Sequence, residues 1–199
     1  MKGAVDLDIL IPEAKLSARV LELGSEISHV FRGGEPPVMV CVLKGSVVFL
    51  ADLVRAMDID VNVDFMSISS YAESRSSSGV VRIVKDLETD LTGRDVLIVE
   101  DIVDTGLTLN YLRRTLSARD PASLRTVTLL DKAVRRIIPV ELEWSGFEIP
   151  DTFVLGYGLD HEGLYRNVSD LIVVPDIAQL VAEPRMYVSS LWPNAAPAE

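Results

Sequence analysis

Three acids and a threonine-containing turn stand next to one another in the segment VEDIVDTGLTL, residues 99–109. The residues with chemical potential are Glu100, Asp101, Asp104, Thr105, Gly106 and Thr108. A Thr-Gly-x-Thr turn that opens a helix offers free backbone N–H groups, two hydroxyls and the positive end of the helix dipole, which together suit a phosphate. Carboxylates repel a phosphate, but they accept hydrogen bonds from ribose hydroxyls and bind magnesium. The segment therefore predicts a phosphorylated sugar as ligand.

A simpler interpretation of the same segment makes Asp104 a helix N-cap and leaves Glu100 and Asp101 as solvated loop acids. A cap needs only one acid, whereas crowding three of them raises the cost of each charge. A nucleoside-triphosphatase lacks support because no GxxxxGK[ST] pattern occurs, and a dinucleotide fold lacks support because no GxGxxG follows a strand. These absences exclude two common classes of phosphate-binding protein.

The elements that must position these residues follow from the hydrophobic pattern. Apolar runs at 38–43, 96–100 and 126–131 predict buried strands, and the ligand crevice of an open parallel sheet lies beyond the carboxyl ends of its strands. Apolar residues spaced by three and four predict helices from Pro12 to before Gly33, at 47–57 and at 107–118. The order predicts an α/β fold with a mostly parallel central sheet flanked by helices.

Weaker patterns complete this outline. Further strands are expected at 61–68, 80–84, 153–156 and 171–174, with a short helix from Ile177 and a Pro/Ala tail from Pro193. The stretch 67–80 is serine-rich without apolar periodicity, which predicts a mobile loop. It is either a lid over the site or the tip of a surface hairpin.

Composition bounds the class of protein. The 199 residues suit one domain, and 48% hydrophobic with 25% charged residues are typical of globular proteins. A net charge of -11 argues against a nucleic-acid partner. No signal or membrane-spanning segment is evident, and the single Cys41 fits a reducing compartment, so we expect a cytoplasmic protein.

The segment at 99–109 resembles the phosphoribosyl-pyrophosphate signature of type I phosphoribosyltransferases, and in its Glu-Asp form it is similar to the hypoxanthine-guanine phosphoribosyltransferases. The resemblance extends from about Val38 to Val174. It includes LKGS at 43–46, Ser70-Tyr71, Asp131-Lys132 and GFEIPDTFVLGYGLDHEGLYRN at 146–167. It implies the type I fold with a mobile loop and a small hood, Mg²⁺ as cofactor, and transfer of a phosphoribosyl group to a 6-oxopurine.

The resemblance also implies roles around the phosphorylated ribose. Glu100 and Asp101 would hold the ribose hydroxyls, partly through Mg²⁺, and the turn from Thr105 to Thr108, including Gly106 and Leu107, would cradle the 5-phosphate. Asp104 would exchange a proton with an imidazole-ring nitrogen of the purine.

For pyrophosphate, the resemblance implies Lys44 and Gly45, with a cis peptide bond at that turn, and Arg166. Asp160, at the base side of the site, would hold a second Mg²⁺. Ser70 and Tyr71 would belong to the lid.

For the base, the resemblance implies that Lys132 donates to the exocyclic oxygen of a 6-oxopurine, which disfavours adenine. Phe153 would stack on the base and Val154 would bind it through its main chain.

Less specific interpretations stay open for several of these residues. Lys132 could be a solvated charge, Phe153 a core residue, and Asp160 with Arg166 a surface ion pair. Outside the predicted site, the pair 135–136 reads as solvated arginines, and His29 and His161 as ordinary residues. Two functional alternatives remain: a phosphoribosyltransferase for xanthine or another base, and an RNA-binding regulator on the same fold. We expect a homo-oligomer, a dimer or tetramer.

Overall fold

The structure is a computed structural model that describes residues 6–70 and 81–193. Its chain forms two compact units. The large unit is Ala18–Asp151, and the small unit combines Met1–Ser17 with Thr152–Glu199.

A six-stranded sheet, in the order β4-β3-β2-β5-β6-β7, forms the centre of the large unit. Its strands are β2 (Val38–Leu43), β3 (Asn62–Ser70), β4 (Val81–Lys85), β5 (Asp95–Val103), β6 (Ser123–Asp131) and β7 (Trp144–Glu148). Only β4 runs antiparallel to its neighbour, β3, so all other adjacent pairs are parallel. The predicted α/β class and mostly parallel sheet are confirmed.

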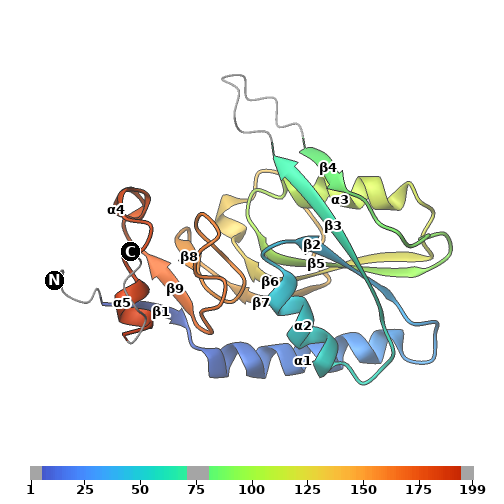
Figure 1. Ribbon diagram of the computed structural model, residues 1–199. Helices are drawn as coiled ribbons and strands as arrows, with labels where there is room; N and C mark the ends of the chain where they lie inside the picture. Colours follow the sequence, from blue (N-terminus) through green and yellow to red (C-terminus); the bar gives the residue numbers. More distant parts are fainter. Residues whose placement is uncertain (1–5, 71–80, 194–199) are drawn as a thin grey trace. The chain divides into compact units, whose positions relative to one another are not determined.

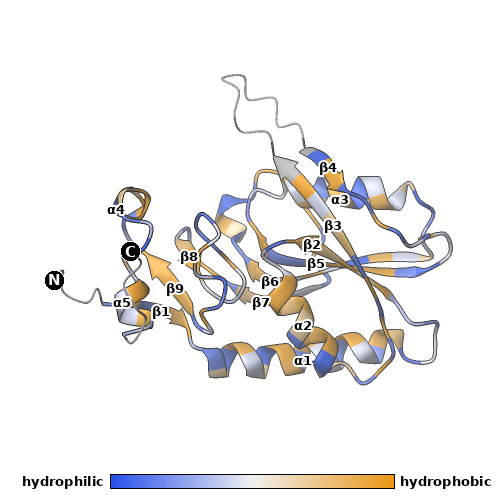
Figure 2. Cartoon of the chain, in the orientation of Figure 1, coloured by the Kyte–Doolittle hydropathy of each residue, from blue (hydrophilic) through white to orange (hydrophobic). Residues whose placement is uncertain are grey.

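Helices cover both faces of this sheet, as Figure 1 shows. They are α1 (Glu13–Phe31), α2 (Val47–Ala56) and α3 (Leu107–Ser117), with a short 3-10 turn, η1 (Ala133–Arg135). Helices α1 and α2 share one face and approach closely, since a Cβ on Gly24 would lie 2.7 Å from the backbone of Ala56. Figure 2 shows the amphipathic banding of α1 and the apolar central strands.

One hydrophobic core cluster of the large unit lies between this sheet and α3. Its buried side chains come from β2, β3, β5, α3 and the segment before β5: Val38, Val40, Val42, Met66, Leu91, Val96, Ile98, Val103, Leu109, Leu112 and Leu116. Burying each is worth roughly 1.5–3 kcal/mol before entropy is subtracted. This packing fixes the carboxyl ends of β2 and β5 next to the start of α3.

The small unit contains a three-stranded antiparallel sheet in the order β1-β9-β8. Its elements are β1 (Asp8–Ile11), β8 (Phe153–Leu155), β9 (Leu171–Val174), α4 (Ile177–Ala182) and α5 (Val188–Leu191). The predicted strands at 153–156 and 171–174 therefore exist, but they belong to a separate sheet, in which β9 lies between β8 and β1.

Several predicted boundaries need correction. The predicted start of the loop at residue 67 is wrong, because residues 67–70 belong to β3, where Ser70 pairs with Val81. The rest of that loop, residues 71–80 with Tyr71, lies outside the described residues, as does the tail after 193. The sequence pattern missed β1, β7 and α5. Within the described part of the chain, no helix is long and apolar enough to cross a bilayer.

Candidate active site

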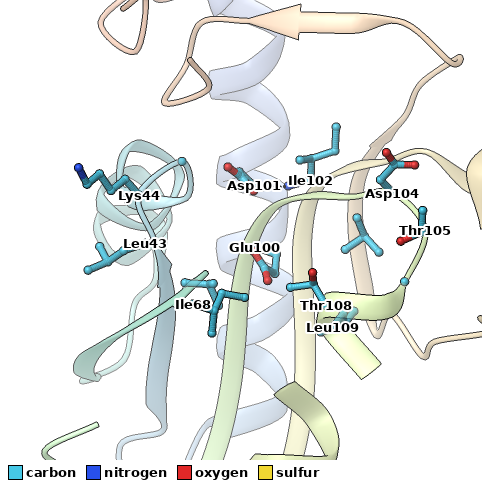
Figure 3. Close-up of a pocket in the computed structure, with 14 residues that line it drawn as sticks. Leu43, Lys44, Ile68, Glu100, Asp101, Ile102, Asp104, Thr105, Thr108 and Leu109 are labelled. Atoms are coloured by element: carbon cyan, nitrogen blue, oxygen red, sulfur yellow. Dashed lines mark hydrogen bonds between the residues drawn. The ribbon is translucent and has the colours of Figure 1, made fainter. Parts of the chain in front are cut away.

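A cavity of about 240 Å³ opens at the carboxyl ends of β2 and β5. Eight of the predicted site residues line it: Lys44, Gly45, Glu100, Asp101, Asp104, Thr105, Gly106 and Thr108. Figure 3 shows the carboxylates of Asp101 and Asp104 on either side of Ile102, Glu100 below them in this view, and Lys44 across the cavity. The two polar groups expected from the sequence, acids and a threonine turn, thus share one wall.

Glu100 is the most unusual group in the cavity. It lies within β5, and only 6% of its surface is exposed. Burial, with the neighbouring charge of Asp101 as a smaller cause, raises the pKa of its carboxyl well above the ordinary value. Among the described residues, none donates a hydrogen bond to this carboxylate. Such an acid favours a ligand that brings a cation or hydroxyl donors.

The turn before α3 leaves amide groups available. Gly106 occupies the N-cap position with a left-handed backbone (φ 85°), so the N-cap residue itself has no side chain to cap the helix. Asp104 as N-cap is therefore wrong, because it lies too early in the chain. A Cβ on Gly106 would lie 2.6 Å from the carbonyl oxygen of Ile138, so only glycine fits. Leu107 starts α3 but does not line the cavity; its amide contacts the Thr105 hydroxyl at 3.4 Å.

The turn after β2 forms the opposite wall. The peptide bond between Leu43 and Lys44 is cis, as the resemblance implied. Gly45 is buried against Asp101, and a Cβ at this position would lie 1.6 Å from the Asp101 Oδ2 atom. The absence of a side chain at Gly45 therefore leaves the space that the Asp101 carboxylate occupies.

We predict that Gly45→Ala displaces this carboxylate and lowers kcat/KM for the phosphorylated sugar expected from the sequence by about tenfold or more, because small displacements of positioned groups are costly. The atom that must move is the end of a side chain, so the fold should persist. Steady-state kinetics and thermal unfolding measure both effects. Gly34→Ala is the matched control, since its Cβ would meet only the Phe31 oxygen at 3.6 Å. Unchanged kinetics in Gly45→Ala would contradict the prediction.

Asp104 has a partner that the sequence did not reveal. The Arg135 Nε atom donates to Asp104 Oδ1 at 3.1 Å, and Arg135 Nη1 lies 3.4 Å from both oxygens of Asp151. Arg136 pairs with Asp131. The expectation that both arginines are solvated is wrong for Arg136, only 17% of whose side chain is exposed, whereas Arg135 is exposed as expected and is paired with acids.

Lys132 is buried, with 8% of its surface exposed, so the solvated alternative is wrong. Its backbone N–H donates to the Val103 carbonyl, which places it beside the end of β5. No described residue accepts a hydrogen bond from its ammonium. Lys132 is not among the residues that line the cavity.

The remaining predicted residues belong to the small unit. Phe153 and Val154 lie on β8, an edge strand whose outer side has main-chain groups unpaired within that sheet. The Phe153 ring meets His161 edge-on, with centroids 6.3 Å apart. Asp160 and Arg166 form an ion pair at 2.7 Å, and Arg166 also donates to the Gly158 carbonyl. The expected roles of these residues stay predictions.

Sequence reasoning missed Arg135, Asp151 and the Arg136–Asp131 pair. The only signal was their position, since Asp131 ends a strand at the site edge and the two arginines follow within five residues. Which acid each arginine faces depends on how the loop folds back, and residue spacing does not specify that.

Comparisons with known proteins agree with this geometry. The family model for the phosphoribosyl transferase domain matches residues 15–162. A hypoxanthine-guanine phosphoribosyltransferase of Mycobacterium avium is 49% identical over 166 residues, covering 81% of this chain and 82% of that protein. A hypoxanthine phosphoribosyltransferase of Escherichia coli is 47% identical over 163 residues, covering 81% and 92%.

Solved structures give the same result. The crystal structure of a hypoxanthine-guanine phosphoribosyltransferase from Bacillus anthracis matches with a TM-score of 0.80 and 44% identity, over 84% of this chain and 98% of that one. The hypoxanthine phosphoribosyltransferase of Trypanosoma cruzi matches with a TM-score of 0.77 and 40% identity, over 83% and 95%. The chain therefore belongs to the phosphoribosyl transferase family.

Proposed function

We propose that this chain transfers the 5-phosphoribosyl group of phosphoribosyl pyrophosphate to a 6-oxopurine, hypoxanthine or guanine, and releases pyrophosphate. The observation that carries the proposal is one cavity in which two acids of β5, the buried Glu100 and the half-buried Asp101, stand beside the start of α3. Relatives named for this activity at 47% and 49% identity support it.

The cavity suits both ends of the sugar phosphate. The amides and hydroxyls from Thr105 to Thr108 would hold the 5-phosphate at the positive end of α3. Glu100 and Asp101 would accept hydrogen bonds from the ribose hydroxyls, because ionised carboxylates are acceptors only. Lys44 and Gly45, on the opposite wall, would bind pyrophosphate.

Magnesium fits these acids. Their oxygens are hard ligands, and the buried Glu100 carboxylate has no hydrogen-bond donor among the described residues. No cluster of three or more His, Cys, Asp or Glu side chains within 6–70 and 81–193 could hold a metal alone. Glu100 and Asp101 would therefore share a Mg²⁺ ion with substrate oxygens, as this ion commonly binds. When bound, it supplies positive charge to the phosphorylated sugar and pyrophosphate.

The chemistry exchanges one bond for another at the anomeric carbon. The bond to the pyrophosphate oxygen breaks and a bond to a purine ring nitrogen forms, while the N–H proton of the base passes to Asp104. Lys44 would stabilise the negative charge that develops on pyrophosphate. We further propose that Phe153 and Val154 bind the base, and that Asp160 and Arg166 assist at pyrophosphate.

Lys132 supplies the preference for a 6-oxopurine. No residue of the described chain accepts a hydrogen bond from its ammonium, and an exocyclic carbonyl oxygen would supply an acceptor. We predict that Lys132→Gln raises KM for hypoxanthine roughly ten- to a hundredfold, the usual worth of a charged hydrogen bond. Initial rates at varied base concentration measure this. Lys15→Gln, at an exposed lysine of α1, is the control, and equal KM values in both variants would contradict the assignment.

The proposal is tested by offering each base in turn. With Mg²⁺ and phosphoribosyl pyrophosphate, we expect nucleotide formation from hypoxanthine and guanine and little from adenine, as followed by chromatography. Nucleotide formation from xanthine alone would favour the alternative of a phosphoribosyltransferase for xanthine. Absence of product with every base, together with salt-dependent RNA binding, would favour a regulator, although a net charge of -11 opposes it.

The proposal also covers the cellular location, the oligomeric state and the lid. We place the protein in the cytoplasm as a homo-oligomer without nucleic-acid partners. Light scattering coupled to size exclusion measures its mass in solution. The lid role of Ser70 and Tyr71 remains a prediction, tested by whether deletion of the loop raises hydrolysis relative to transfer.

A further inference from the structure

Arg135 is the residue whose contacts the proposed function does not yet use. Its guanidinium lies between two carboxylates, Asp104 in the cavity wall and Asp151 outside it. Arg135 and Asp104 are about half exposed, at 46% and 40% of their side-chain surfaces. An ion pair this exposed adds little to stability. Its position beside Asp104, the proposed proton acceptor, therefore points to a role in the reaction.

The backbone holds Arg135 in place on both sides. The N–H of Lys132 donates to the Val103 carbonyl at 2.9 Å. The N–H groups of Ile137 and Ile138 donate to the Thr105 carbonyl at 3.0 and 3.1 Å. The loop that carries Arg135 is therefore bonded to the chain just before and just after Asp104. This arrangement fixes the guanidinium relative to the carboxylate before any ligand binds.

The hydrogen bond also distinguishes the two oxygens of Asp104. Arg135 Nε occupies Oδ1, and no described residue donates to Oδ2. A carboxylate held by one oxygen has less rotational freedom, and its other oxygen is left for a ligand. The second anchor, from Arg135 Nη1 to Asp151, keeps the planar guanidinium from turning with its partner.

We propose that Arg135 is a positioning residue for the proton transfer: it holds Oδ1 of Asp104 so that Oδ2 faces the imidazole-ring nitrogen of the bound purine. The inference rests on the proposed function. In the transfer, the N–H proton of the base passes to Oδ2, and Arg135 keeps its own proton throughout. Arg135 is not among the residues that line the cavity.

The test is a double-mutant cycle on the full chain, with hypoxanthine as substrate. Arg135→Ala should lower kcat about tenfold and leave KM for phosphoribosyl pyrophosphate unchanged, because the phosphate turn is untouched. In the Asp104→Asn background the same change should cost less than about twofold, since the group being positioned is already lost. Arg135→Lys should recover part of kcat, because it keeps the charge without the two-acid fork.

Controls separate positioning from general loss of an ion pair. Arg32→Ala removes an arginine that pairs with Asp58 at 2.7 Å on the surface and should leave kcat unchanged. Asp151→Asn removes only the outer anchor and should give a smaller loss than Arg135→Ala. Equal losses from Arg135→Ala in both backgrounds, or no loss in the wild type, would overturn the proposal. An inactive wild type would instead refute the proposed function.

Discussion

Replacing Asp104 with asparagine is expected to lower kcat for nucleotide formation by about a hundredfold or more, the usual contribution of a positioned general base. Asparagine keeps the shape of the side chain but cannot accept the proton of the base. Asp104 lines the cavity and lies directly before the turn that opens α3, so the base nitrogen and the phosphate would be held by adjacent residues. Saturating steady-state kinetics with hypoxanthine measures the effect.

The matched control is Asp58→Asn, since Asp58 is also an exposed carboxylate paired with an arginine. It should retain wild-type kcat, and both variants should unfold near the wild-type temperature because neither carboxylate is buried. A loss below about tenfold in Asp104→Asn would show that the proton goes elsewhere. A loss confined to KM would assign Asp104 to binding alone.

The local part of the site was predictable from the sequence because a parallel sheet brings the carboxyl ends of its strands together. Lys44 follows β2, while Glu100 and Asp104 occupy the end of β5 and the turn after it. Their positions at the ends of parallel strands were enough to predict that they line one cavity. The turn at Gly106 was predictable for a related reason, since glycine before a helical pattern marks a special backbone position.

Features that depend on tertiary packing were not predictable. The burial of Glu100 follows from the extension of β5 past residue 100, where the pattern suggested a loop. The strand at Phe153 was found, but its sheet also contains β1, which is only four residues long and was not recognised in the sequence. The pairing of Arg135 with Asp104 joins residues 31 positions apart, and no periodicity encodes such a contact.

Substitution of the buried Glu100 is expected to change both activity and stability. Glu100→Gln should lower kcat/KM for phosphoribosyl pyrophosphate at least about tenfold, because a charged acceptor for ribose and metal is lost. The same change should raise the free energy of unfolding of the ligand-free protein at neutral pH by about 1 kcal/mol or more, because burial disfavours the ionised carboxyl and glutamine carries no charge. Urea unfolding in the presence of a chelator measures the gain.

The expected increase in the free energy of unfolding follows from the raised pKa of Glu100. The folded state binds this proton more tightly than the unfolded state does, so the free energy of unfolding falls as pH rises from the ordinary value of 4.5 through the folded pKa. Glutamine has no such dependence, so its advantage should shrink as pH falls toward 4.5. Added Mg²⁺ with phosphoribosyl pyrophosphate should stabilise the wild type more than the variant, because only the wild type keeps both carboxylates.

Asp64 is the control that separates this effect from burial as such. Burial alone would raise its pKa, but backbone N–H groups of Thr89, Phe65 and Glu88 donate to its carboxylate and bring the pKa below 3.8. Asp64→Asn should therefore lower the free energy of unfolding at neutral pH. The difference between wild type and variant should disappear as the pH falls through the folded pKa of Asp64. Opposite signs at two buried acids would mean that Glu100 lacks donors because the site reserves it for a ligand, whereas destabilisation by both substitutions would mean that Glu100 is a structural residue.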